Sequence, residues 1–164
     1  MTDKITVLGV GNLLWADEGI GPRLAMALEG RLQGHGLAQR VEVIDGGTQG
    51  LYLLPIVTEA KKLLLFYAVS LGLEPGALVI LQGDEVEARF SHLPVSLHQT
   101  SLQDLLASAR LLGWQPEQLA LIGIQAKDTE SWGGPVTPEV LAAVEPALQA
   151  GLELLEDWDV LSLD

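Results

Sequence analysis

The sequence predicts a three-layer α/β domain, in which helices cover both faces of a mixed, twisted five-stranded sheet. Short apolar runs alternate along the chain with segments of helical spacing, and this alternation is typical of a largely parallel sheet. The run Leu63–Phe66 is continuously apolar, as expected for a strand covered on both faces. At 164 residues, the chain favours a single domain spanning residues 1–164.

In the first half of the chain, three strands are predicted over residues 5–8, 41–44 and 63–66. Pro22 suits the first turn of a helix between the first two strands, and Gly34 ends that helix. Its apolar stripe consists of Leu24, Leu28 and Leu32. After the turn at residues 45–50, a short helix is expected through Leu51, Leu54 and Val57.

The fourth predicted strand, residues 77–81, should run antiparallel to the third. Only Leu71–Gly76 separates the two strands, whereas a parallel return needs a crossover of about a dozen residues. The end of the fourth strand then lies far from the glycine-rich turns. Residues 83–97 must therefore carry the chain back across the sheet.

Two helices and one strand complete the predicted fold. The first helix has an apolar stripe from Leu102 to Leu112, and a strand follows over residues 119–124. The last helix opens at Thr137 and Pro138. Pro146 lies inside its pattern and should kink or break it near Glu145, because proline lacks an N–H and crowds the preceding turn.

Composition excludes several classes of function. The net charge is −13, and residues 128–164 contain nine acids and no Lys or Arg, so a nucleic-acid partner is not expected. The sequence contains no run of about 18 apolar residues, so no membrane span is expected. Its N-terminus lacks the pattern of a signal peptide. The absence of cysteine excludes disulfides and thiolate chemistry. We therefore expect a cytoplasmic protein that is not inserted in a membrane.

The carboxyl ends of the parallel strands should gather a candidate site at one edge of the sheet. Asp17 and Glu18 follow the glycine-rich turn after the first strand, Asp45 ends the second, and Tyr67 ends the third. The returning loop brings His98 to the same edge. Glu18, His98 and Asp45 can therefore converge, either as ligands of a divalent metal or as a general acid–base pair.

Each of these residues also has a simpler interpretation. Glu18 alone can be an acid that stabilises a helix start, and His98 a capping or surface histidine. Asp45 beside two glycines is ordinary turn chemistry. Gly9 and Gly11 begin a dinucleotide-binding pattern, but its third glycine is missing and the two acids would repel a pyrophosphate. No Gly-x-Ser-x-Gly elbow supports a serine hydrolase.

Several motifs, in a constant order and spanning nearly the whole chain, resemble those of the NiFe-hydrogenase maturation endopeptidases. The N-terminal motif is Gly9–Gly19, and the motif after the second strand is Asp45–Leu51. The remaining matches are Leu71–Leu78, Ser96–Thr100, Gly133–Gly134 and Glu145–Leu148. One motif alone is weak, whereas all of them together are specific.

The resemblance implies a function. Such endopeptidases remove a C-terminal extension from the precursor of the hydrogenase large subunit once nickel has been inserted, so the partner would be this precursor and the nickel would be supplied by it. The family's metal ligands are a Glu, an Asp and a His. The Glu and His map to Glu18 and His98, the implied catalytic and metal-binding residues. The motif Asp45, Gly46, Gly47 and Thr48 is the implied substrate-binding segment.

The chain departs from the family pattern at the third ligand. Alignment on residues 72–76 places Tyr67 where the family has its Asp. A neutral phenol with a pKa near 10 is a poor nickel ligand. At the level of the site, either the activity is reduced or Asp45 or Asp17 compensates for the missing ligand. At the level of function, the chain is either a processing endopeptidase or a catalytically weakened binder that acts as a checkpoint for the immature large subunit.

Overall fold

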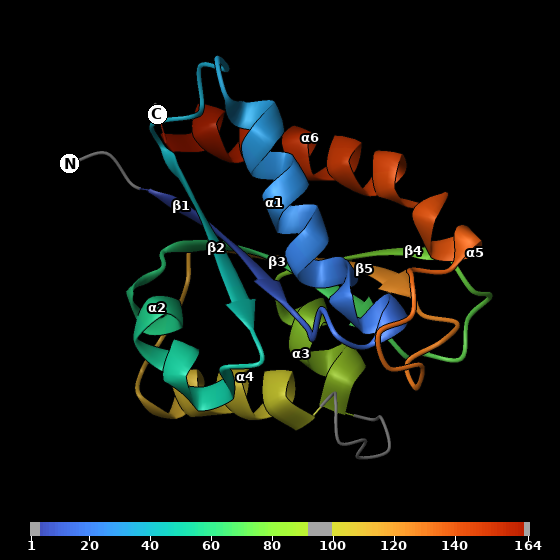
Figure 1. Cartoon of the computed structure of the whole chain (residues 1–164). Helices are drawn as coiled ribbons and strands as arrows, with labels where there is room; N and C mark the ends of the chain where they lie inside the picture. The colour runs from blue at the N-terminus through green and yellow to red at the C-terminus, as the bar shows by residue number, and fades with distance from the viewer. Residues whose placement is uncertain (1–3, 92–99, 163–164) are drawn as a thin grey trace.

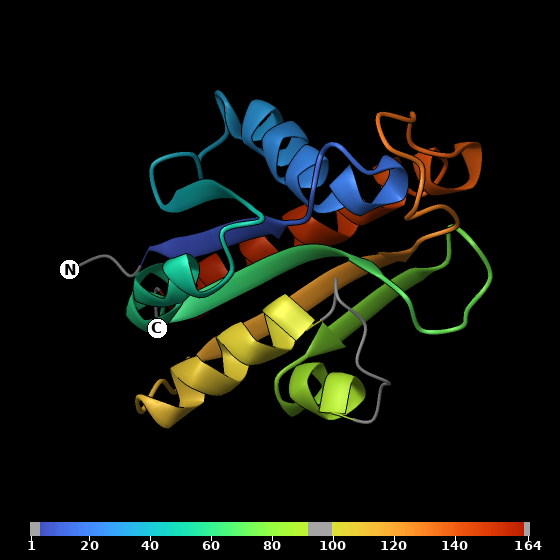
Figure 2. The same ribbon diagram turned by 60° about the horizontal axis from the view of Figure 1, so that its bottom comes forward.

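The computed structural model describes residues 4–91 and 100–162 and forms three layers (Figure 1). Helices α1 and α6 cover one face of a five-stranded sheet, and α2, α3 and α4 cover the other (Figure 2). The strands are β1 Ile5–Val10, β2 Val41–Gly47, β3 Lys62–Val69, β4 Leu78–Gln82 and β5 Gln118–Gln125. The helices are η1 Ala16–Gly19, α1 Ile20–Leu32, η2 Gly50–Leu53, α2 Leu54–Glu59, α3 Asp84–Ser91, α4 Thr100–Leu111, α5 Pro138–Leu141 and α6 Val144–Ser162.

The sheet has the strand order β2-β1-β3-β5-β4. Strands β1, β2, β3 and β5 are parallel, and β4 pairs with β5 in the antiparallel direction. The expected mixed sheet with a reversed fourth strand is therefore confirmed. Four carboxyl ends meet at one edge of the sheet, called here the carboxyl edge.

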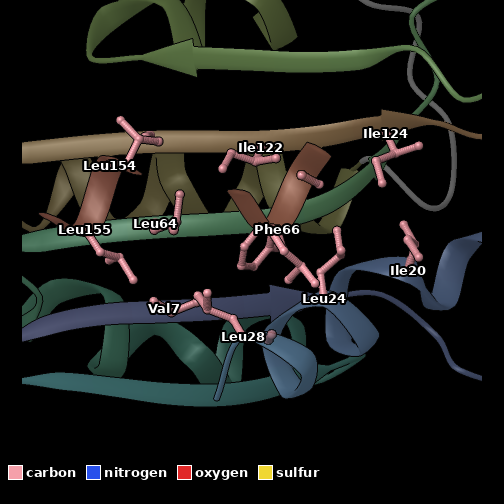
Figure 3. Packing of buried hydrophobic residues seen from close by; sticks show 14 of the residues in the cluster. Val7, Ile20, Leu24, Leu28, Leu64, Phe66, Ile122, Ile124, Leu154 and Leu155 are labelled. Carbon is pink, nitrogen blue, oxygen red and sulfur yellow. The ribbon is translucent and has the colours of Figure 1, made fainter. Parts of the chain in front are cut away.

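The central strand β3 separates two hydrophobic cores, because successive side chains of a strand point to opposite faces. Leu64 and Phe66 join the core beneath α1 and α6, which Figure 3 shows from close by. Leu63, Leu65 and Tyr67 join the core beneath α2, α3 and α4. All eight residues of β3 are buried, as the continuous apolar run predicted.

Two features of the helices differ in detail from the expectation. Helix α3 lies in the segment for which only a return across the sheet was expected. It is short, and Val86 and Phe90 are its two buried apolar side chains. The last helix is broken as predicted, but between Leu141 and Val144 rather than near Glu145. The ring of Pro146 crowds the carbonyl four residues earlier, so the interruption falls at Ala142.

No helix within residues 4–91 and 100–162 is long and apolar enough to cross a membrane.

Candidate active site

The turn after β1 is shaped by close backbone contacts that only glycine allows. A Cβ at Gly21 would lie 2.2 Å from the Val10 carbonyl oxygen and 2.6 Å from that of Phe66. A Cβ at Gly11 would lie 2.1 Å from the Glu18 carbonyl oxygen. The first turn of α1 therefore packs directly on the ends of β1 and β3, and the turn between them holds Asp17 and Glu18 at the carboxyl edge.

Asp17 is fully buried and binds the loop that follows β5. Its Oδ2 accepts hydrogen bonds from the N–H groups of Lys127 at 2.8 Å and Asp128 at 2.9 Å. Its Oδ1 accepts a bond of 2.7 Å from the N–H of Thr137, whose hydroxyl also donates to the carboxylate. The Asp17 N–H donates to the Asp128 carbonyl at 2.9 Å. Because these bonds engage both oxygens, Asp17 has a positioning role at the edge.

Glu18 follows directly and is only 8% exposed. Its N–H donates to the Trp15 carbonyl at 2.8 Å within the 3-10 turn. Its carboxylate is close enough to Tyr67 to raise the pKa of that phenol. Glu18, in the turn that follows β1, therefore lies near Tyr67 of the neighbouring strand β3.

Tyr67 is packed as a core residue. It lies between Val10 of β1 and Gly123 of β5 in the sheet register, and its side chain is 4% exposed. Its ring meets that of Phe90 from α3 edge-on, with centroids 6.1 Å apart and planes at 70°. Burial first, and the Glu18 charge second, raise the pKa of Tyr67 well above its ordinary value of 10. The phenol is therefore neutral at physiological pH, which makes it a poor donor to a metal ion.

The turn from Asp45 to Thr48 lies next to the turn after β1. The Asp45 carboxylate accepts a hydrogen bond of 3.0 Å from the N–H of Gly47, which has a φ of +50°. A Cβ at Gly46 would come within 2.9 Å of Leu8 and Leu53. The N–H of Gly11 donates to the Gly47 carbonyl at 3.0 Å. Asp45 and Thr48 are exposed, so this turn presents polar groups at the edge.

His98 lies outside the described residues, so its expected meeting with Glu18 stays a prediction. Within residues 4–91 and 100–162, no three His, Asp or Glu side chains gather in a way that could hold a metal ion. At the positions where the resemblance implies metal ligands, the described donors are the Glu18 carboxylate and the neutral Tyr67 phenol. Only the first fits a divalent metal.

Sequence reasoning found the acids after β1 but missed what Asp17 does. Its partners lie 110 to 120 residues further along the chain. The residues around Asp17 do not show whether it is a buried hydrogen-bond acceptor or an ordinary exposed acid at the start of a helix. The sequence also shows no sign that Trp15 pairs with Trp132, because the two residues lie in loops that are far apart along the chain.

A separate groove of about 610 Å³ lies between β4 and α3. Its lining is mostly apolar and includes Leu73, Val79, Leu81 and Ala88, with Glu85 and Arg89 as its charged side chains. Glu18, Asp45 and Tyr67 are not among its lining residues. The volume of this groove therefore says nothing about the chemistry of the carboxyl edge.

Comparison with known proteins agrees with this architecture. A family model described as hydrogenase maturation protease matches residues 22–154. The chain belongs to the hydrogenase maturation protease family. HupD of Rhizobium leguminosarum bv. viciae, a hydrogenase expression/formation protein, is 43% identical to it over 157 residues, which are 96% of this chain and 76% of HupD.

Relatives of this protease family from Escherichia coli are similar along nearly their whole length. The hydrogenase 2 maturation protease of strain K12 is 41% identical over 158 residues, which are 96% of this chain and 93% of that protein. The solved structure of the hydrogenase maturating endopeptidase HybD is 37% identical and has a TM-score of 0.80. That likeness covers 94% of this chain and 93% of HybD. The predicted family and fold are both confirmed.

Proposed function

We propose that this protein is an endopeptidase that removes the C-terminal extension of a nickel-loaded large-subunit precursor of a NiFe hydrogenase. Membership of the maturation protease family implies processing of that precursor. The observation that supports the activity in this chain is the placement of Glu18. Its carboxylate is nearly buried at the carboxyl edge, in a turn fixed by the hydrogen bonds of Asp17.

In this proposal the nickel ion belongs to the substrate. Glu18 supplies a carboxylate oxygen and His98 an imidazole nitrogen toward it, donor types that suit a divalent transition metal. The low exposure of Glu18 strengthens its interaction with a cation, because little water competes. The turn Asp45–Thr48 would contact the peptide near the cleavage point with the polar groups that it exposes.

Tyr67 favours a second candidate function, a binder that inspects the precursor without cutting it efficiently. The strand end that would add a second carboxylate to Glu18 instead holds a buried, neutral phenol packed on Phe90. With two of three donors, the site would hold the nickel of the precursor less tightly. This candidate predicts binding of the precursor with slow or absent cleavage.

Incubation with purified precursor, followed by mass spectrometry of the large subunit, separates the two candidates. The endopeptidase proposal predicts loss of the C-terminal extension from nickel-loaded precursor, no loss from nickel-free precursor, and no loss with Glu18→Gln. Glu18→Gln keeps the size of the side chain but removes its charge. An intact nickel-loaded precursor after prolonged incubation with the unaltered chain, in a complex that survives gel filtration, would instead establish the binder.

A further inference from the structure

Large apolar side chains are exposed on the segments that follow the strands at the carboxyl edge. Among the described residues, twelve such side chains are exposed, and six lie in the segments that follow β1, β2, β3 and β5. These six are Leu13, Leu14, Leu51, Tyr52, Leu73 and Trp132. Scattered exposed hydrophobic residues need no explanation, whereas residues gathered around one site indicate a surface that binds another molecule.

Three of these residues, Leu13, Leu14 and Trp132, form what we call the apolar rim. They are 43%, 52% and 66% exposed, respectively. The N–H of Gly133 donates to the Leu14 carbonyl at 2.7 Å, which joins the two loops that bear them. The Trp132 ring also stands edge-on to Trp15, with centroids 5.0 Å apart. Glu18 lies in the turn that continues directly from this segment, so the rim borders the candidate active site.

The apolar rim is fixed in place before any partner arrives. The Asp17 carboxylate binds three N–H groups of the loop that bears Trp132, and Trp15 and Trp132 pair as an isolated antiparallel bridge. A partner therefore meets side chains whose backbone is already ordered, which lowers the entropy lost on binding. Tryptophan at such a position is the residue type most often dominant in a protein interface.

The loop that bears Trp132 carries mostly negative charge. Hydrogen bonds from Ser131 and Glu130 hold the pKa of the Asp128 carboxyl below its ordinary value, so it is ionised at neutral pH. Glu130 beside it is exposed. The one cation of this loop, Lys127, is 2.6 Å from Glu139 in an ion pair. The surface that complements this arrangement has an apolar centre flanked by Lys or Arg side chains.

We propose that the apolar rim docks the folded body of the hydrogenase large-subunit precursor, through an apolar patch flanked by basic side chains. The inference rests on the proposed function for the identity of the partner. It adds where the partner lies: the body of the precursor sits on Leu13, Leu14 and Trp132, and its C-terminal extension reaches Glu18 beside them.

The test measures the dissociation constant of nickel-loaded precursor by calorimetry, in a Glu18→Gln background so that the precursor is not consumed. Trp132→Ala should raise the Kd about tenfold or more, as for a dominant interface tryptophan. Leu14→Ser should raise it several-fold while leaving the Trp15–Trp132 pair in place. The matched control is Leu111→Ser, which changes an 88% exposed leucine at the end of α4. This control should leave the Kd unchanged.

The charge of the surface is tested in the same assay. Glu130→Lys should raise the Kd, and added salt should reduce the difference between this variant and the unaltered surface. A Leu14→Ser variant that binds with an unchanged Kd, or a Glu130→Lys variant that binds more tightly, would overturn the docking proposal. Binding and cutting are separate measurements: failure to cleave would reject the endopeptidase while the apolar rim still docks the precursor.

Discussion

The ends of β1 and β3 are neighbours in the sheet, but they are built in opposite ways. After β1, glycines let the backbone turn sharply, and a buried carboxylate, Asp17, accepts hydrogen bonds from a distant loop. At the end of β3, directly beside Val10, Tyr67 is buried against Phe90 as a neutral aromatic residue. The end of β1 is therefore held by polar hydrogen bonds, and the end of β3 by apolar packing.

This difference shows which parts of a site can change without loss of the fold. The register of β3 is set by its backbone pairing with β1 and β5, which does not depend on the side chain at position 67. The turn after β1 has no such freedom, because its shape depends on atoms that other residues would displace. Substitutions at the two strand ends should therefore differ in what they cost.

The largest effect is expected at Asp17. Asp17→Ala leaves the N–H groups of Lys127, Asp128 and Thr137 without their acceptor, so the free energy of unfolding should fall by about 3–5 kcal/mol. Urea denaturation of the purified chain measures it. Asp128→Ala is the matched control, since that carboxylate also accepts two N–H groups of the same loop but at the surface. An equal loss in both variants would show that burial of Asp17 contributes nothing.

A smaller effect separates two glycines of one helix. Gly21→Ala forces a Cβ into the Val10 and Phe66 carbonyl oxygens and should destabilise the chain by about 2–3 kcal/mol. Gly30→Ala, also in α1, meets nothing within 4 Å and should stabilise it by about 0.5–1 kcal/mol. Thermal denaturation of the two variants should show a lower melting temperature for Gly21→Ala and a higher one for Gly30→Ala. A Gly21→Ala variant as stable as the unaltered chain would contradict the close contact, and destabilisation by Gly30→Ala would contradict the gain expected from helix propensity.

The smallest effect concerns pH at the end of β3. Burial and Glu18 raise the pKa of Tyr67 in the folded chain, so its neutral form contributes stability that is fully present below about pH 10. Above that pH the unfolded chain ionises this tyrosine while the folded chain does not, and the contribution falls. Tyr67→Phe has no ionisable hydroxyl and therefore lacks this pH-dependent contribution to the free energy of unfolding. The difference in unfolding free energy between the two forms should therefore change above pH 10 and stay constant between pH 7 and 9.

The order of elements was predictable because it depends on local signals. The continuous apolar run of β3, the leucine stripe of α1 and the short connection before β4 each predicted what the structure shows. Helix α3 was missed because it has only one buried apolar pair, Val86 and Phe90. The position of the break before α6 was two to three residues off, because a proline disturbs the turn that precedes it.

The candidate site was predictable in part. Topology alone brings Glu18, Asp45 and Tyr67 to one edge, and the structure places them at the carboxyl ends of β1, β2 and β3. The burial of Tyr67, its contact with Phe90 and the bonding of Asp17 depend on residues far away in the sequence. Long-range packing of this kind leaves no local pattern to detect. The meeting of His98 with Glu18 remains a prediction.

The comparison of the two strand ends is tested most directly by calorimetric titration of Ni²⁺ into the unaltered chain, Tyr67→Asp and Tyr67→Asn. Tyr67→Asp returns a charged oxygen ligand beside Glu18, so it should bind nickel at least about tenfold more tightly than the unaltered chain, a change in the range that even outer-shell residues produce. Tyr67→Asn, of similar size but uncharged, should not. Nickel binding by the unaltered chain as tight as that of Tyr67→Asp would contradict the account and make Asp45 the first candidate for the third ligand.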